Sequence, residues 1–233
     1  MTSYKSMSDK PSVRSPWFWV PSLYFAQGIP YVAVMIVSVL MYKRLGVSNT
    51  DIALYTSWLN LPWVIKPFWS PFVDLLKTKR WWVATMQLLI GAGLAGVAFT
   101  IPTTFFFQAS LAVFWLLAFS SATHDIAADG FYMLALDSHE QAFFVGIRST
   151  FYRIAIIAGQ GVLVMFAGFL ENSTGNIPLA WSVTFFILGG LFLALFLYHR
   201  YILPLPKGDK LSATVTPSTI LKEFFATFTS FFK

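Results

Sequence analysis

Long stretches that are almost free of charged residues are the feature that most constrains the fold of this chain. An α-helix needs about 20 mainly apolar residues to cross a bilayer, and helices of soluble proteins rarely stay uncharged for that length. Six stretches meet this requirement, at residues 15–42, 52–73, 81–101, 103–136, 142–170 and 177–198. The sequence therefore predicts an all-α membrane protein with six transmembrane helices.

The composition agrees with a membrane protein and excludes several other classes. Charged residues make up 11% of the 233 residues and apolar residues 57%, whereas soluble domains carry about 25% charged residues. The chain contains no cysteine, which excludes disulfides, thiol catalysis and cysteine-ligated zinc. Its length allows about six crossings with short loops but not twelve.

The distribution of lysine and arginine predicts the orientation in the membrane. If both ends of the chain are cytoplasmic, the cytoplasmic segments hold twelve of these residues and the outer segments only Lys43 and Arg44. This asymmetry favours cytoplasmic N- and C-termini. The net charge of +6 then faces anionic membrane lipid. Lipid is thus an expected partner, and no nucleic-acid partner is required.

The chain divides into four predicted parts. Residues 1–14 form a short cytoplasmic tail, residues 15–202 the six-helix transmembrane bundle, and residues 203–215 a polar, proline-containing cytoplasmic linker. Residues 216–233 repeat phenylalanine, leucine and isoleucine at helical spacing, with polar residues between them. This pattern predicts an amphipathic helix that lies in the membrane interface.

Charged residues inside the spans are functional candidates, because an unpaired charge in a bilayer costs several kcal/mol. Asp125 and Asp129 are four residues apart and share one helix face. Counted from the turn between the fourth and fifth spans, Asp129 is level with Arg148 and Asp125 with Arg153. We therefore predict these two pairs. Each pair has two open interpretations, a site for solute and protons or a structural clamp between the two helices.

Lys66 is the other charge within a span, and Pro67 follows it directly. The proline removes a backbone hydrogen bond and loosens the helix there. Two roles stay open for this lysine. Its ammonium group could hold an anionic group such as a carboxylate. Alternatively, the side chain could extend so that its ammonium group reaches the cytoplasmic interface.

Polar residues within the spans are predicted to line a cavity. Gln27, Gly28 and Pro30 are expected to break the first span and to expose backbone groups, as broken helices of transporters do. His124 is expected to make a local hydrogen bond, with a proton relay as the alternative. The residues predicted to line the cavity are Gln27, Asn60, His124 and Gln160.

Several motifs resemble a known transporter family. Residues 70–74 (SPFVD), followed by Lys77, Lys79 and Arg80, resemble the loop signature of the major facilitator superfamily, with Leu75 where an arginine is usual. Residues 64–74 and 122–130, together with Gly28-Ile29-Pro30 and Tyr152-Arg153, are similar to segments of AmpG-type permeases.

This resemblance implies a fold and a task. The family consists of proton-driven importers of muropeptides in the bacterial inner membrane, and related eukaryotic members carry acetyl-CoA. The fold has twelve helices in two halves, each built from two inverted three-helix repeats, with the solute between the halves. Neither a cofactor nor a catalytic residue is implied. His124 replaces the polar amide common at its position, which leaves the substrate and the coupling ion open.

The resemblance also implies roles for individual residues. The positions that match the family motifs are expected to form the solute and proton site or the inward-facing end. The solute and proton site would comprise Lys66, Asp125, Asp129 and Arg153, and the cytoplasmic gate Asp74, Lys79 and Arg80. Arg148 is added to this gate because of its predicted pairing with Asp129, and not because of the resemblance.

Only one six-helix half is expected from this length. We interpret the chain as the N-terminal half of a transporter, with a homodimer of six-helix units as the alternative. A non-transporting membrane subunit is a second alternative. A membrane phosphotransferase is disfavoured, because Asp129-Gly130 leads into Phe131 rather than into that enzyme class's motif. Two acids alone also hold a divalent cation poorly, so no metal site is predicted.

Overall fold

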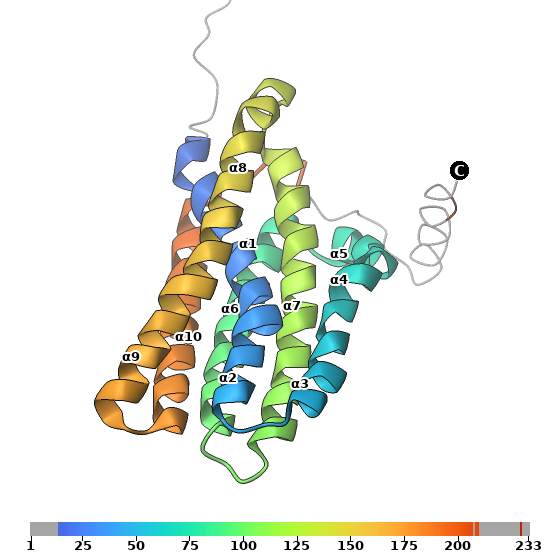
Figure 1. Cartoon of the computed structure of the whole chain (residues 1–233). Helices are drawn as coiled ribbons and strands as arrows, with labels where there is room; N and C mark the ends of the chain where they lie inside the picture. The colour runs from blue at the N-terminus through green and yellow to red at the C-terminus, as the bar shows by residue number, and fades with distance from the viewer. Residues whose placement is uncertain (1–13, 207, 210–228, 230–233) are drawn as a thin grey trace, which may run out of the picture.

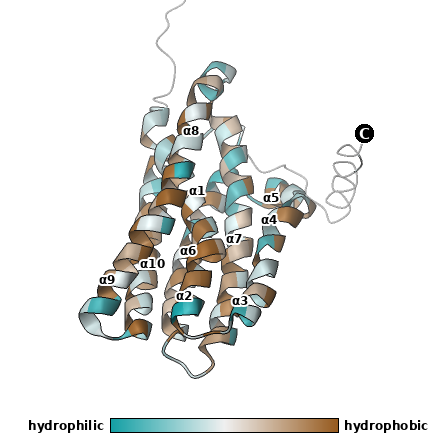
Figure 2. Cartoon of the chain, in the orientation of Figure 1, coloured by the Kyte–Doolittle hydropathy of each residue, from teal (hydrophilic) through white to brown (hydrophobic). Residues whose placement is uncertain are grey.

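The computed structural model describes residues 14–206, 208, 209 and 229. The predicted tail at residues 1–14 and the amphipathic helix at 216–233 therefore lie almost wholly outside the described residues, as does most of the predicted linker. All regular secondary structure in the described part is helical, and five continuous helices are long and apolar enough to cross a membrane. Figure 2 shows hydrophobic residues along the helices and hydrophilic residues mostly toward their ends.

The five long helices correspond to the predicted spans, with boundaries that differ by a few residues. The first, Pro16–Arg44, contains α1 (Val20–Val32) and α2 (Ser38–Arg44), and the fifth span, Ser138–Thr174, contains α8 (Ser138–Ala158) and α9 (Val164–Thr174). The remaining three are single elements, α6 (Lys79–Thr100), α7 (Phe106–Ala135) and α10 (Ile177–Ile202).

The second predicted span is interrupted. It consists of three short helices, α3 (Asn49–Thr56), α4 (Leu61–Ile65) and α5 (Ser70–Leu76), joined by 3-10 turns at Ser57–Asn60 and Lys66–Phe68. These pieces form one column beside α7 (Figure 1). The sequence contains three prolines here, Pro62, Pro67 and Pro71. Each lacks a backbone N–H and disturbs the preceding turn, which accounts for the short pieces.

The first span does not break where it was expected to. Helix α1 continues through Gly28 and Pro30, and the expected interruption is therefore wrong. A wider π-helical turn follows at Ala33–Val37, between α1 and α2. Such turns are typical of places where the regular hydrogen-bond pattern is disturbed.

The connections alternate between the two ends of the bundle (Figure 1). Residues 45–48, 101–105 and 175–176 lie at one end, and residues 77–78 and 136–137 lie at the other. We call the latter the basic end, because Arg14, Lys77, Lys79, Arg80 and Arg200 are near it in the chain. The turn from α7 to α8 is fixed there by a capping box. Asp137 accepts a hydrogen bond from the Glu140 N–H at 2.9 Å, and Glu140 accepts one from the Asp137 N–H at 3.1 Å.

The contacts between helices follow a twofold pattern. Helix α1 packs along α8, while α7 packs along α4 and α5. If the first three spans are superposed on the last three, the contact of α1 with α8 coincides with the contact of α7 with α4 and α5. The contacts of α6 with α10 and of α1 with α7 map onto themselves, whereas the extensive contact of α6 with α7, which are consecutive in the chain, has only a small counterpart between α1 and α10. This is the arrangement of one half of a major facilitator fold with two inverted three-helix repeats.

The packing of α1 on α8 depends on a glycine. A Cβ atom built on Gly28 would lie 2.7 Å from the Ala155 Cβ and 2.9 Å from the Tyr152 backbone oxygen. Both contacts are shorter than van der Waals distance, and neither neighbour is the flexible end of a side chain. Small residues allow membrane helices to approach this closely.

Gly28→Ala is therefore expected to destabilise the bundle by about 1–3 kcal/mol, because the added methyl group forces α1 and α8 apart. Thermal unfolding in detergent, followed by the loss of helical circular dichroism, measures the effect. Gly161→Ala is the matched control, since a Cβ atom at Gly161 meets nothing within 4 Å. Equal melting temperatures for the two variants would show that the close approach does not matter.

Candidate functional site

A cluster of three polar side chains joins α1, α7 and α8. The Tyr24 hydroxyl of α1 donates a hydrogen bond to Asp129 Oδ1 of α7 at 3.0 Å. Arg148 Nη1 of α8 donates to the Tyr24 oxygen at 3.0 Å and lies 3.5 Å from Asp129 Oδ1. The predicted pairing of Asp129 with Arg148 is thus confirmed, with Tyr24 as a third member.

Aromatic rings fix the position of the Arg148 side chain. Its guanidinium carbon lies 5.2 Å from the centre of the Tyr24 ring and 5.0 Å from that of Tyr132, and a cation is attracted to both ring faces. The Tyr132 hydroxyl donates to the Gln141 carbonyl oxygen at 2.6 Å, which holds that ring in place. Arg148 is therefore a pre-positioned cation.

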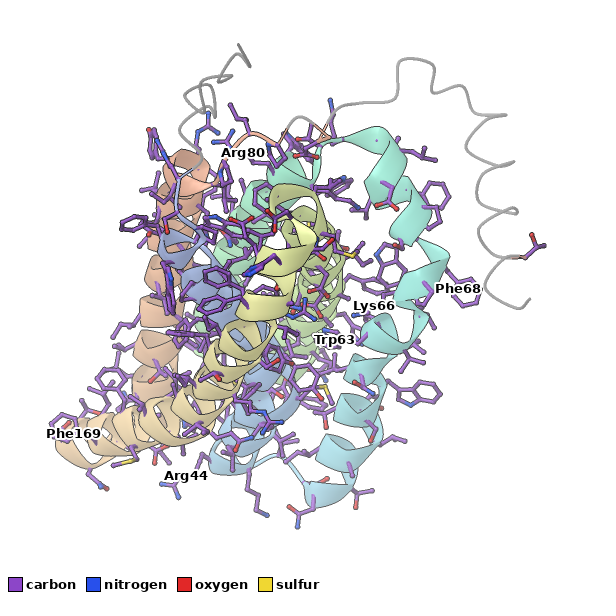
Figure 3. The ribbon with its side chains drawn as sticks, turned by 90° about the horizontal axis from the view of Figure 1, so that it is seen from above. Arg44, Trp63, Lys66, Phe68, Arg80 and Phe169 are labelled. Atoms are coloured by element: carbon purple, nitrogen blue, oxygen red, sulfur yellow. The ribbon has the colours of Figure 1, made fainter. Side chains whose placement is uncertain are left out.

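One helical turn further from the basic end, Asp125 faces Lys66. The Lys66 Nζ and Asp125 Oδ2 atoms are 3.8 Å apart, with the lysine side chain 35% exposed and the aspartate side chain 11% exposed. Asp125 Oδ1 is buried without a hydrogen-bond partner, although Gln27 and Trp63 face this carboxylate. Figure 3 shows Lys66 and Trp63 on the inner side of their column, whereas Phe68 points away from the bundle.

The predicted pairing of Asp125 with Arg153 is wrong, because no ion pair within 4 Å joins them in the described part of the chain. The reason is rotational. Residues four apart differ by about 40° around a helix, and residues five apart by about 140°. Arg148 and Arg153 are five apart, so Arg153 is turned by about 140° around α8 from Arg148, which meets Asp129. Lys66 pairs with Asp125 instead.

Tyr24, Asp129 and Arg148 border an open cavity of about 410 Å³. Arg153 lines it and is exposed, and among the described residues it forms no ion pair. Gln27 is part of its lining. The complete lining consists of Tyr24, Gln27, Asp129, Arg148, Ser149, Tyr152 and Arg153. The cavity therefore presents two guanidinium groups and a single carboxylate, with Asp125 close behind it.

The other residues predicted to line the cavity lie elsewhere. His124 is fully buried, and its Nε2 is 3.1 Å from the Gln87 amide nitrogen. The same amide group contacts His199 Nδ1 at 2.9 Å, and His199 Nε2 lies 3.0 Å from Ser22 Oγ. His124 thus belongs to a buried network that joins α1, α6, α7 and α10. Asn60 and Gln160 are not part of the cavity lining.

The residues predicted to form a gate do not form one cluster but make separate contacts. Asp74 forms an ion pair with Lys79, and the Lys79 stem covers Gly130 of α7. Arg80 does not join this pair, because its guanidinium donates to the Arg200 backbone oxygen. Arg148 lies in the Tyr24 cluster described above.

Two carboxylates with structural contacts were not predicted. Asp209 accepts hydrogen bonds from the Lys79 and Arg80 N–H groups at 2.6 and 3.0 Å, and so caps the start of α6. Glu171, at the opposite end, pairs with Arg44 and accepts a hydrogen bond from Trp181 Nε1 at 2.7 Å.

Sequence signals existed for some of the residues that were missed. Tyr24 lies three residues before Gln27 and hence on the same helix face. Glu171 lies in a segment predicted to be on the outer side, where Lys43 and Arg44 are the only predicted cations to pair with it. Nothing local indicates that Asp209, far from Lys79 in sequence, caps α6.

Comparison with known proteins agrees with this geometry. The sequence pattern of the BT1 family matches residues 25–223. The chain belongs to the BT1 family. A protein of Rickettsia conorii named as transporter AmpG 4 is 28% identical to this BT1 family chain over 211 residues, which is 84% of the chain and 48% of the relative.

Two further relatives match shorter segments. The anhydromuropeptide permease of Escherichia coli K12 is 27% identical over 151 residues, covering 61% of the BT1 family chain and 30% of the permease. An uncharacterized protein of Schizosaccharomyces pombe is 28% identical over 145 residues, covering 56% of the chain and 28% of the relative. The chain thus spans less than half the length of these relatives.

The predicted resemblance to AmpG-type permeases is confirmed by these matches. With five helices suited to cross a membrane, this BT1 family chain is a multi-pass membrane protein. Two of the relatives above are named as a transporter and a permease.

Proposed function

We propose that this chain forms one half of a proton-coupled importer for anionic sugar or peptide solutes of the muropeptide kind. The cavity with Arg148 and Arg153 is the observation that carries the proposal. Guanidinium groups bind carboxylates through charge-assisted, often paired hydrogen bonds. The name of the Escherichia coli relative, an anhydromuropeptide permease, supports the solute class.

Arg153 is the residue that first receives the solute anion in this proposal. Its guanidinium lines the cavity and forms no ion pair among the described residues. Arg148 is already engaged by Tyr24 and Asp129. Arg148 therefore orients the bound solute, and Asp129 keeps the Arg148 guanidinium charged and in place.

Asp125 is the proposed proton carrier, and Lys66 its partner. The contact between them joins one carboxylate oxygen to the ammonium group at 3.8 Å, which is longer than a hydrogen bond. The other oxygen is buried and unpartnered, so it can carry a proton. When Asp125 takes up a proton, Lys66 is released to attract the solute anion. Loss of that proton restores the pair and favours release of the solute.

The remaining proposed roles concern the ends of the bundle. Asp74, Lys79, Arg80 and Arg148 would act at the cytoplasmic gate, with the basic end and both termini facing the cytoplasm of a bacterial plasma membrane. This orientation rests on the lysine and arginine distribution. A second six-helix unit, in a longer polypeptide or a second copy of the chain, would close the open side of the cavity. The greater length of the relatives supports this part of the proposal.

The test measures accumulation of a labelled anhydromuramyl peptide by vesicles that contain the 233-residue chain and have an alkaline interior. We expect accumulation that a protonophore abolishes. Saturable binding of the peptide to the detergent-solubilised chain, without accumulation, would support the binding site and assign transport to an assembly with a second unit. Absence of both binding and accumulation would overturn the proposal.

A further inference from the structure

A second cavity of about 410 Å³ lies at the basic end, between α6 and α10, and shares no residue with the first. Its lining combines arginine, aromatic and aliphatic side chains from the start of α6 and the end of α10. The lining residues used below are Arg80, Trp81, Arg200, Tyr201, Leu205 and Asp209.

Positive charge concentrates at this cavity. The guanidinium groups of Arg14 and Arg200 are near enough to Arg80 to repel its charge. Among the described residues, neither Arg80 nor Arg200 forms an ion pair with a carboxylate. Arg80 Nε is buried and has no hydrogen-bond partner. Like charges gathered in this way are stabilised by an anion between them.

Asp209, the carboxylate that lines the cavity, reduces the net positive charge but does not form an ion pair with either arginine. Its two oxygens accept the backbone N–H groups of Lys79 and Arg80 at 2.6 and 3.0 Å. It attracts the Arg80 side chain but forms no ion pair with it. The site therefore keeps an excess of positive charge.

Apolar and aromatic side chains beside the arginines identify the kind of anion. Trp81 is 44% exposed, Tyr201 69% and Leu205 79%. Tryptophan and tyrosine are typical of the boundary between headgroups and acyl chains. An anion bound here lies next to an apolar surface that suits a hydrocarbon tail, which favours a lipid over a free ion.

We propose that the cavity between α6 and α10 binds the phosphate group of an anionic phospholipid. Arg80 and Arg200 contact the phosphate oxygens, Trp81 and Tyr201 flank the glycerol region, and Leu205 contacts an acyl chain. Guanidinium groups match phosphate geometry well, and basic pockets between membrane helices bind such headgroups. The site lies apart from the proposed transport cavity and does not depend on it.

The test is native mass spectrometry of the 233-residue chain in detergent with equal amounts of phosphatidylglycerol and phosphatidylcholine. We expect preferential retention of phosphatidylglycerol, and at least about a tenfold loss of that preference in the double variant Arg80→Gln and Arg200→Gln. Lys43→Gln is the control, because it removes one cation at the opposite end, where Lys43 contacts Asn49. Helical circular dichroism checks that each variant is folded.

A second measurement separates lipid from free phosphate. Brominated phosphatidylglycerol in mixed micelles is expected to quench fluorescence in the wild-type chain more than in Trp81→Phe, and millimolar inorganic phosphate should not reverse this. Reversal by inorganic phosphate would overturn the lipid assignment in favour of a free anion. Equal retention of both lipids, or unchanged retention in the double variant, would overturn the site itself.

Discussion

Asp125→Asn is expected to reduce solute accumulation driven by a pH gradient by about tenfold or more. The asparagine amide has nearly the same shape as the carboxyl group but cannot carry a proton. It also leaves the Lys66 ammonium without its 3.8 Å partner, so this cation stays available to the solute in every state. Solute binding and exchange of solute across the membrane without a gradient should therefore persist.

Asp51→Asn is the control for this variant. Asp51 is an exposed carboxylate in the first turn of α3, at the end opposite to the basic end, where it forms hydrogen bonds with its neighbour Ser48. Vesicles with matched protein content would be compared for accumulation and for exchange. Full accumulation by Asp125→Asn would remove Asp125 from the coupling mechanism.

Single replacements of the two cavity arginines are expected to differ in their effects on solute binding and on the stability of the chain. Arg153→Gln should weaken binding of the anionic solute by about tenfold or more, because it removes a charge–charge contact, and should leave thermal unfolding unchanged. Arg148→Gln should weaken binding and also destabilise the chain by about 1–3 kcal/mol. It breaks the contacts with Tyr24 and Asp129 and leaves Asp129 with one fewer donor.

Equilibrium binding of labelled solute and thermal unfolding, measured on the same detergent samples, check this pair of variants. Arg153→Lys keeps the charge and should retain most of the affinity, which distinguishes loss of charge from loss of shape. If Arg153→Gln binds the solute as well as the wild type does, the cavity is not the anion site. If both variants unfold at the wild-type temperature, the Tyr24 cluster has no clamping role.

The overall architecture was largely predictable from sequence, because the membrane imposes one simple requirement. Each crossing must be a helix of sufficient length with few charges, and this rule located the spans at residues 15–42 and 177–198 within a few residues. The turn at 136–137 was similarly accessible, since Asp137 and Glu140 have the spacing of a capping box. Five of the six predicted spans are continuous helices.

The candidate site was only partly predictable, because depth along a helix is easier to count than rotation around it. Counting residues from the turn matched Asp129 with Arg148 correctly. The same count failed for Arg153, which lies on a different side of α8. Lys66 reaches Asp125 from a separate column of helices, and no local pattern specifies that approach. Similarly, the buried contact of His124 with Gln87 depends on the packing of α6 against α7.

The two groups of helices that contact the aspartates of α7 differ in their freedom to move. On one side, Gly28 brings α1 and α8 almost into backbone contact, so Tyr24, Gln27, Arg148 and Arg153 belong to a single rigid unit. On the other side, Lys66 is in the 3-10 turn between α4 and α5, where proline has already removed hydrogen bonds. A movement of the jointed column therefore requires less disruption than a separation of the α1–α8 pair. Lys66 would then be the moving contact, and the arginines the fixed reference against which the solute is held.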